Sequence, residues 1–315
     1  MTAHDGVLLV DKHPGCTSHD VVQQVRRILR QKRIGHCGTL DPDATGLLLL
    51  TLGQATRLTR FLIHAPKVYE GTVRFGVATD TFDASGRVIA EMPIAGLSEA
   101  AVHAAMPRFV GTYEQTLPAY SAHKVGGVKL YELARRGEDV PVVAKEISVY
   151  EFQPVGPLVD GRIGFRLGCS SGTYARAIAH ELGRDLGCGG HLASLRRVEI
   201  GPFRVASALP VDELARRTAA GESLAEAWIP IDRVALPFDA VEVDAQQERR
   251  LATGQTVLAR NVGGEEGDWV RLVNRRGQLI AVGSIAERIG GAGVGVVQPR
   301  IVFKTGADVI EFSTT

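Results

Sequence analysis

The sequence predicts an α+β protein of two domains, a larger N-terminal one and a small β-rich one at the C-terminal end. The chain has 315 residues, which is more than one small hydrophobic core organises. Strand and helix patterns are interspersed over most of the chain. From about Pro237 only short strand patterns follow, without a long helix. We therefore expect domains over residues 1–236 and 237–315.

The composition is that of a soluble globular protein, with 45% hydrophobic and 23% charged residues. No stretch reaches the roughly 18 consecutive apolar residues of a membrane span. The first residues lack the basic and apolar regions of a signal peptide, so we expect a cytoplasmic location. The net charge of +1 argues against a uniformly basic nucleic-acid-binding protein but allows a local basic face.

The cysteine and histidine residues show no metal-binding pattern. The four cysteines are scattered without a CxxC pair, and the nine histidines form no HxxxH pattern. We expect neither a zinc site nor a disulfide framework.

The first elements are a strand and a helix. The apolar run from Gly6 to Val10 predicts the strand, and Thr17 followed by Asp20 resembles a capping box at the start of a helix that reaches Leu29. The helix ends in a basic cluster over residues 26–33. This cluster is either a solvated helix end or a patch that contacts phosphates.

The next stretch, residues 34–55, combines turn residues with an apolar run. Glycines at 35, 38 and 46 and a proline at 42 precede the run 47–50, which indicates a tight loop pinned to the core. The loop contains His36, Asp41 and Asp43. Loops that hold titratable groups on a rigid scaffold are common sites of chemistry. The alternative is a turn in which Asp41 caps a backbone N–H.

Helix and strand patterns alternate along the chain after this loop. Residues 118–127 are irregular, and Arg176 lies off the apolar face of its helix, directed to the helix start or to solvent. We expect helices over 55–64, 98–111, 129–136 and 174–187, strands over 68–77, near 88, and over 147–152, 162–169, 269–273, 279–282 and 300–303, and turns at 80–86 and 195–197.

Several blocks of residues together resemble the TruB-type tRNA pseudouridine synthases. The resemblance covers nearly the whole chain, and the C-terminal part resembles the PUA-type RNA-binding domain more weakly. The matching blocks are Asp11-Lys12, His36, Gly38-Thr39-Leu40-Asp41-Pro42, Gly53-Gln54-Ala55-Thr56, Lys67-Val68-Tyr69, Thr79-Asp80-Thr81 with Asp83, Tyr120-Ser121-Ala122 with Lys124, Ser171-Gly172-Thr173-Tyr174 with Arg176, and His191 with Leu195-Arg196-Arg197.

The resemblance implies a catalytic fold with a central mixed, mainly antiparallel sheet flanked by helices, followed by a PUA-like β-barrel. It also implies that the protein converts a uridine in the T-loop of tRNA, position 55, to pseudouridine without a cofactor. Asp41 is implied as the catalytic aspartate, Tyr69 as the ring beneath the target base and Arg176 as the ionic partner of Asp41. Tyr174 and Leu195 are implied as pocket walls, and His36 as the side chain that fills the gap left by the flipped base.

The residue types suit this isomerisation. A carboxylate can attack covalently, or stabilise a positively charged sugar, only when it is ionised, and a nearby Arg176 would lower the pKa of Asp41. Whether Asp41 attacks C6 of the uracil or C1′ of the ribose stays open. Tyr69 is a candidate base for the C5 proton, with a core tyrosine as the alternative. Flipping a base costs roughly a few kcal/mol, which stacking by His36 would partly offset.

RNA loops are recognised largely through shape and phosphate contacts. The basic residues that could supply these contacts, each with a solvated surface charge as the alternative, are the cluster 26–33, Lys12, Lys124, Lys129, Arg196 and Arg197.

The sequence argues against three other functions. An RNA-guided synthase subunit usually carries extended basic termini, which this sequence lacks, so we expect a stand-alone enzyme that needs no obligate protein partner and can act as a monomer. A non-catalytic tRNA-binding or folding protein is disfavoured by the joint presence of Asp41, Tyr69 and Arg176. A glycoside hydrolase that uses Asp41 and Asp43 is poorly supported, since two side chains in one tight loop are badly placed to flank a bond.

Overall fold

The structure is a computed structural model that describes residues 4–121, 123–290 and 293–303. Its largest feature is an 11-stranded mixed sheet in the order β14-β1-β3-β12-β4-β11-β10-β7, with β2, β13 and β15 attached at its sides. Only the β1–β14 and β3–β12 pairs of this sheet are parallel. The strands are β1 (Gly6–Lys12), β2 (Ile34–His36), β3 (Thr45–Leu52), β4 (Lys67–Phe75), β7 (Gly111–Thr116), β10 (Ala144–Val159), β11 (Arg162–Cys169), β12 (Gly190–Ile200), β13 (Phe203–Arg204), β14 (Leu209–Pro210) and β15 (Trp228–Pro230).

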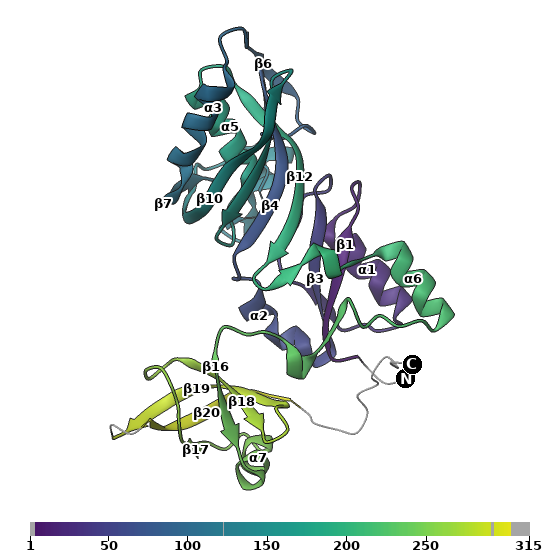
Figure 1. Cartoon of the computed structure of the whole chain (residues 1–315), viewed down its shortest axis with the longest axis vertical. Helices are drawn as coiled ribbons and strands as arrows, with labels where there is room; N and C mark the ends of the chain where they lie inside the picture. The colour runs from purple at the N-terminus through teal and green to yellow at the C-terminus, as the bar shows by residue number, and fades with distance from the viewer. Residues whose placement is uncertain (1–3, 122, 291–292, 304–315) are drawn as a thin grey trace.

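One end of the sheet is built on the apolar run of β3. β3 pairs with β1 from Gly46 to Leu52, and the leucines at 47–50 are fully buried. Helix α1 (Ser18–Ile28) and helix α6 (Val211–Ala220) lie beside these strands (Figure 1). The capping box predicted at Thr17 and Asp20 is present, whereas α6 was not predicted.

The other end of the sheet carries a second core. Helix α5 (Ala175–Asp185), helix α3 (Glu99–Ala105) and the 3₁₀ turn η2 (Met106–Phe109) cover β4, β10 and β11 (Figure 1). The predicted N-cap Ser98 accepts a hydrogen bond from the Ala101 N–H. The short hairpin β5 (Val77–Thr79) and β6 (Val88–Glu91) encloses the predicted turn.

The prediction of a turn at residues 195–197 was wrong, because these residues lie within β12. This strand of 11 residues runs between β3 and β4 in the middle of the sheet. A strand was not predicted here because two adjacent arginines interrupt the alternation of apolar and polar residues. In the structure the second of them, Arg197, is buried in the sheet.

The C-terminal part is a curled sheet of five strands in the order β16-β18-β19-β20-β17 with one short helix. Together with the mixed main sheet and its helices, this confirms the predicted fold class. The elements are β16 (Asp239–Val243), α7 (Ala245–Ala252), β17 (Val257–Ala259), β18 (Trp269–Asn274), β19 (Leu279–Ile289) and β20 (Val294–Val302).

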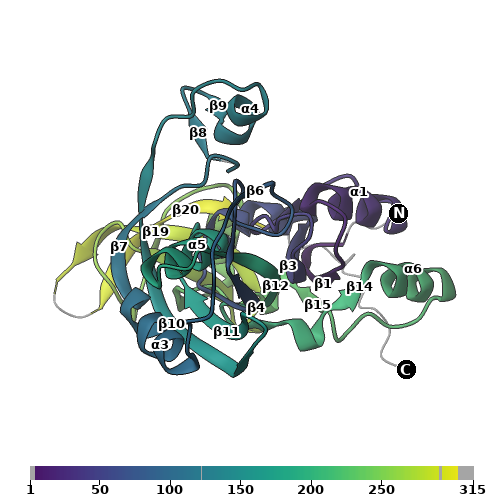
Figure 2. The same cartoon turned by 90° about the horizontal axis from the view of Figure 1, so that it is seen from above.

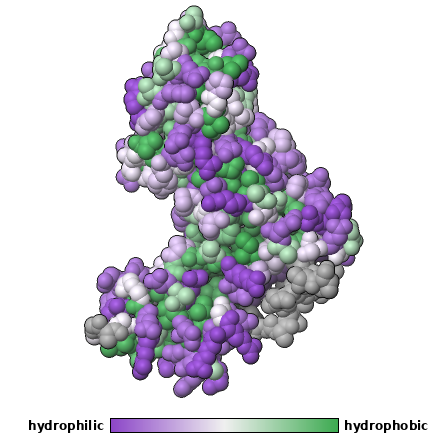
Figure 3. Space-filling view, viewed as in Figure 1, coloured by the Kyte–Doolittle hydropathy of each residue, from purple (hydrophilic) through white to green (hydrophobic). Residues whose placement is uncertain are grey.

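An aromatic cluster joins the C-terminal sheet to the main body. Phe61, on the short helix α2 (Thr59–Leu62), packs edge-on against Phe238 and Trp269, each at 4.9 Å between ring centroids. The 3₁₀ turn η1 (Gly53–Leu58) adds Arg57, which donates to the Val302 carbonyl. Figure 3 shows that the molecule is hollowed between its upper part and the C-terminal sheet.

A small arm stands out from the body in the view of Figure 2. It consists of the hairpin β8 (Lys124–Val125) and β9 (Val128–Lys129) followed by helix α4 (Leu130–Arg135). Ala122, named in the family resemblance, and the side chain of Lys129 lie outside the described residues. No helix in the described part of the chain is long and apolar enough to cross a membrane.

Candidate active site

Asp41 lies in the loop between β2 and β3, where the chain leaves the sheet and returns to it. Its side chain is 46% exposed, so a substrate can reach the carboxylate. Gly46, at the start of β3, has a φ of +98°, and a Cβ there would lie 2.3 Å from the Arg197 carbonyl oxygen. Only glycine allows this close approach of loop and sheet.

Lys12 holds the loop from the β1 side. Its side chain is fully buried, and Nζ donates to the carbonyls of Pro42 and Ala44 at 2.7 Å each, on either side of Asp43. A buried ammonium bound to carbonyls has no free donor facing solvent. The structure therefore gives Lys12 a structural role in the loop, whereas its predicted contact with RNA stays a prediction, against which this burial argues.

Arg197 holds the loop from the β12 side. It is 1% exposed, and its guanidinium donates to the carbonyls of Leu47 at 2.8 Å, Gly38 at 3.1 Å and Thr39 at 3.4 Å. The predicted RNA contact of Arg197 likewise stays a prediction, against which its burial argues. Lys12 and Arg197 together fix the main chain on both sides of Asp41.

Arg176 faces Asp41 from the first turn of α5. Its Nε lies 3.7 Å from Asp41 Oδ2, while its side chain is only 6% exposed. Nη2 donates to the Tyr120 carbonyl at 2.7 Å, and Nη1 lies 3.4 Å from Asp83 Oδ2. The sequence left open whether Arg176 points to solvent, and the structure places it inside, between two carboxylates.

Asp83, the second carboxylate beside Arg176, was not singled out as a site residue from the sequence. It belonged to one of the blocks that resemble the family, but no role was assigned to it. The chain Asp41–Arg176–Asp83 joins three segments that are far apart in the sequence.

Tyr69 and Tyr174 border the same region. Tyr69 projects from β4 into the core side, and burial raises the pKa of its phenol, with Arg197 acting in the opposite direction. Tyr174 is the N-cap residue of α5, its ring lies 5.6 Å from the Arg176 guanidinium carbon, and burial also raises its pKa. Both phenols are thus protonated at neutral pH. Leu195, on β12, packs against the same core.

His36 lies at the end of β2, next to the loop. Burial, and to a lesser extent Arg197, lowers the pKa of His36, so the imidazole is neutral at neutral pH. Its buried Nδ1 has no hydrogen-bond partner among the described residues. A neutral aromatic ring at this place suits stacking on a base.

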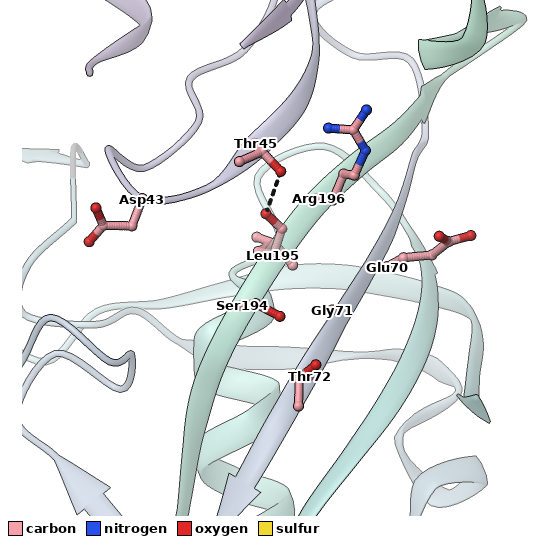
Figure 4. A pocket seen from close by; sticks show the side chains of 8 residues that line it. All are labelled: Asp43, Thr45, Glu70, Gly71, Thr72, Ser194, Leu195 and Arg196. Carbon is pink, nitrogen blue, oxygen red and sulfur yellow. Dashed lines mark hydrogen bonds between the residues drawn. The ribbon is translucent and has the colours of Figure 1, made fainter. Parts of the chain in front are cut away.

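Beside the loop is an open pocket of about 360 Å³, seen close by in Figure 4. Arg196 lines it from β12 and forms two hydrogen bonds with Asp11, at 2.6 and 3.0 Å. Asp43, on the loop itself, points away from the strands (Figure 4). Lys124 is exposed and lies on the β8–β9 arm, apart from these residues. The other lining residues are Thr45, Glu70, Gly71, Thr72, Ser194 and Leu195.

No group of histidine, cysteine, aspartate and glutamate side chains in the described part of the chain is arranged to hold a metal ion.

Comparison with solved structures supports the fold. A chain of an H/ACA ribonucleoprotein bound to a substrate RNA containing 2′-deoxyuridine superposes with a TM-score of 0.71 at 24% identity, over 95% of this chain and 85% of that chain. A chain of a Cbf5-Nop10-Gar1 complex gives a TM-score of 0.70 at 25% identity, over 94% of this chain and 86% of that chain.

Two family models match consecutive parts of the sequence. The N-terminal domain of TruB family pseudouridylate synthase matches residues 26–175, and the C-terminal domain of tRNA pseudouridylate synthase B matches residues 176–241. Fold and models together define the class of the protein: it is a pseudouridine synthase.

The relatives narrow this class. The chain is 42% identical to the tRNA pseudouridine synthase B of Thermobifida fusca over 308 residues, which are 95% of this chain and 98% of the relative. It is 49% identical to the enzyme of that name from Opitutus terrae over 210 residues, which are 67% and 87%. The chain belongs to the TruB family and is a tRNA pseudouridine synthase, an isomerase.

Proposed function

We propose that this enzyme isomerises the uridine at position 55, in the T-loop of tRNA, and that Asp41 is the residue that acts on it. The observation that carries this proposal is the state of Asp41. Its carboxylate is accessible, its loop is fixed by two buried cations, and a buried guanidinium lies 3.7 Å away. A fixed and reachable carboxylate beside a cation suits the reaction.

The reaction breaks the bond between N1 and C1′, turns the uracil and joins C5 to C1′. Asp41 either attacks covalently or stabilises the positive sugar while the base is detached, and Arg176, 3.7 Å away, orients the carboxylate. No electrons are gained or lost, so the chemistry calls for no redox cofactor. The C5 proton must leave in the last step.

Tyr69 is proposed as the ring beneath the base. Because its phenol is protonated at neutral pH, it can accept the C5 proton only while it passes its own proton to another group. Tyr174 and Leu195 are proposed as walls of the pocket. His36 is proposed to stack in the space that the flipped uridine leaves, as a neutral ring beside the loop.

We also propose that residues 237–315 form an RNA-binding domain, that Arg196 and Lys124 contact RNA, and that the enzyme acts as a monomer without a guide RNA. The relatives named tRNA pseudouridine synthase B support a stand-alone enzyme, because one of them matches this chain over nearly its full length. The named solved structures support only the shared fold.

The test compares Asp41→Asn with Asp43→Asn on an unmodified tRNA transcript. Pseudouridine is mapped by carbodiimide-stop primer extension, and tRNA binding is measured on filters. We expect product at position 55 with the wild type and with Asp43→Asn, no product with Asp41→Asn, and binding by all three. Full activity of Asp41→Asn would contradict the proposal, and product at another position would contradict the assigned target.

A further inference from the structure

The loop that presents Asp83 to Arg176 has an unusual backbone. Phe82, directly before Asp83, has a φ of +67°. This left-handed conformation is uncommon for a bulky residue. Such strain persists only where surrounding contacts enforce it, and it is concentrated at functional sites. The contacts of Phe82 identify what enforces it here.

The ring of Phe82 stacks on His180 of α5. The ring centroids are 4.0 Å apart and the planes differ by 16°. Burial lowers the pKa of His180, so its ring is neutral at neutral pH and stacks as an aromatic group. His180 follows Arg176 by four residues, which places both on one face of the helix. Two adjacent loop residues, Phe82 and Asp83, thus meet two residues one turn apart on α5.

The two carboxylate oxygens of Asp83 have different partners, one in its own loop and the other on Arg176. Oδ1 accepts hydrogen bonds from the Thr81 hydroxyl at 2.6 Å and from the Ser85 N–H and hydroxyl at 3.0 and 2.6 Å. Oδ2 faces Nη1 of Arg176 at 3.4 Å. The bonds to Thr81 and Ser85 fix the carboxylate within the loop, but they do not fix the loop on the helix.

The main chain ties the loop to β12. The Phe82 carbonyl accepts from the Leu192 N–H at 2.9 Å, and the Ala84 N–H donates to the Leu192 carbonyl at 3.0 Å. In extended backbone, adjacent side chains point to opposite sides. The left-handed turn at Phe82 lets its ring and the Asp83 carboxylate both reach α5. The strained conformation and the stack therefore serve the same placement.

We propose that Phe82 and His180 are positioning residues for the isomerisation, because their stack sets the Asp83 loop on α5 and so sets the place of Arg176 beside Asp41. This inference rests on the function proposed for Asp41 and Arg176. A misplacement of about 1 Å in a catalytic group can lower a rate by about 100-fold. Loosening the stack of Phe82 on His180 lowers kcat of the tRNA-bound enzyme without weakening its affinity for tRNA.

The test uses two variants that remove one ring each, His180→Ala and Phe82→Asn. Asparagine tolerates the left-handed conformation, so the second variant removes the ring without adding backbone strain. Phe82→Tyr and His180→Phe keep a flat ring at each position. His103→Ala, on an exposed side chain of α3, is the matched histidine control. For each variant, kcat and KM are measured with a tRNA transcript, and folding is checked by thermal unfolding.

We expect kcat to fall about 10-fold in His180→Ala and Phe82→Asn, with KM for tRNA within about twofold of the wild type. The two ring-keeping variants and the control should stay near the wild-type kcat. The inference fails if both ring-removing variants keep the kcat of His103→Ala, if the loss appears in KM, or if Phe82→Tyr is as slow as Phe82→Asn. If His180→Ala does not fold, the Phe82 pair decides.

A double variant separates positioning from a general loss of stability. Because the stack and Asp83 act through Arg176, adding His180→Ala to Asp83→Asn should lower kcat little further than Asp83→Asn alone. Full additivity of the two losses would overturn the inference. A fully active Asp41→Asn would instead overturn the proposed function, whereas an inactive Asp41→Asn with a fully active His180→Ala overturns only the positioning role.

Discussion

Two buried cations in this enzyme bind main-chain carbonyls where a surface lysine or arginine would bind a carboxylate or a phosphate. Lys12 and Arg197 donate hydrogen bonds to main-chain carbonyls in and beside the loop that carries Asp41. A buried donor of this kind costs stability when it is removed, because the carbonyls that it served are left without partners. Conversely, Lys124 is an exposed lysine on the arm and is free to meet RNA phosphates.

This difference predicts opposite effects of two lysine substitutions. Lys12→Met should lower stability by about 2 kcal/mol and reduce kcat, because the loop loses two hydrogen bonds to a charged donor. The tRNA affinity of this variant and its dependence on salt should not change. Thermal unfolding, turnover and filter binding at several salt concentrations measure these quantities.

Lys124→Met is the matched control. It should leave stability unchanged and weaken tRNA binding, with a shallower dependence of affinity on salt, because one phosphate contact is lost. A shallower salt dependence for Lys12→Met would show that Lys12 does contact RNA.

At the scale of elements, the active site depends on how closely β3 and β12 approach. The two strands are parallel partners, with Arg196 opposite Thr45 and Arg197 opposite Gly46. The Asp41 loop enters β3 at this point. The glycine at position 46 is therefore a structural requirement of the site, although it does no chemistry.

Gly46→Ala should destabilise the protein by about 3 kcal/mol or more, because a Cβ would lie 2.3 Å from the Arg197 carbonyl oxygen and the backbone has a φ of +98°. Activity should be lost together with stability, measured by urea unfolding and by turnover. Gly35→Ala is the control, since the nearest atom to a Cβ there is 3.4 Å away. Equal stability of the two variants would contradict this account of the strand contact.

Lys67, the first residue of β4, is a third buried cation behind the loop. Its Nζ donates to the carbonyls of Ile63 and Ala65 at the end of α2. Burial lowers the pKa of Lys67 from its ordinary 10.5 to about 8, and Arg197 contributes in the same direction. The folded state thus loses this proton at a lower pH than the unfolded state does.

This shift predicts a pH dependence of stability. Between about pH 8 and 10.5 the unfolded chain keeps the Lys67 proton and the folded chain does not, so stability rises with pH across this window. The rise from this group should approach about 3 kcal/mol. Urea unfolding of the wild type and of Lys67→Met at pH 7.5 and 10.5 isolates it, since the variant lacks this contribution. Equal pH dependence of both proteins would refute the shift.

At the scale of the whole molecule, the C-terminal sheet is fastened to the body by aromatic packing at α2. Trp269 contributes to this contact from β18, and the Arg60 guanidinium carbon lies 5.4 Å from its ring centroid. Residues of the sheet, such as Val282 and Ile301, belong to the same hydrophobic cluster as residues of β1 and β3. Removal of the sheet would expose this cluster, so a point substitution tests its role more cleanly than a truncation.

Trp269→Ala should lower stability by about 3 kcal/mol and weaken tRNA binding, because the proposed RNA-binding sheet is no longer held firmly on the body. The rate at saturating tRNA should change little. Leu258→Ala, at an exposed position of the same sheet, is the control. Urea unfolding, filter binding and turnover give the three quantities. An unchanged tRNA affinity in a destabilised Trp269→Ala protein would argue against an RNA role for the sheet.

Arg176 connects three separate parts of the chain. Its guanidinium binds the β2–β3 loop through Asp41, the β5–β6 loop through Asp83 and the base of the arm through the Tyr120 carbonyl. The active site is thus assembled from separate parts of the chain around one buried charge.

The sequence by itself determined the features that depend on a few neighbouring residues. The caps at Thr17 and Ser98, the buried run that became β3 and the loop around Asp41 are local patterns, and the structure contains them. The family resemblance added the fold class and the family, both of which the comparisons confirm. The individual roles proposed for Asp41 and its neighbours stay predictions.

The tertiary structure alone decided what depends on distant partners. The bond from Arg197 to the Gly38 carbonyl joins residues 159 positions apart, and no local pattern indicates that this arginine is buried. For the same reason residues 195–197 of β12 were predicted as a turn, and the burial of Lys12 and Arg197 was not foreseen. Whether a charge faces solvent or the main chain is set by what folds over it, and that is a property of the assembled sheet.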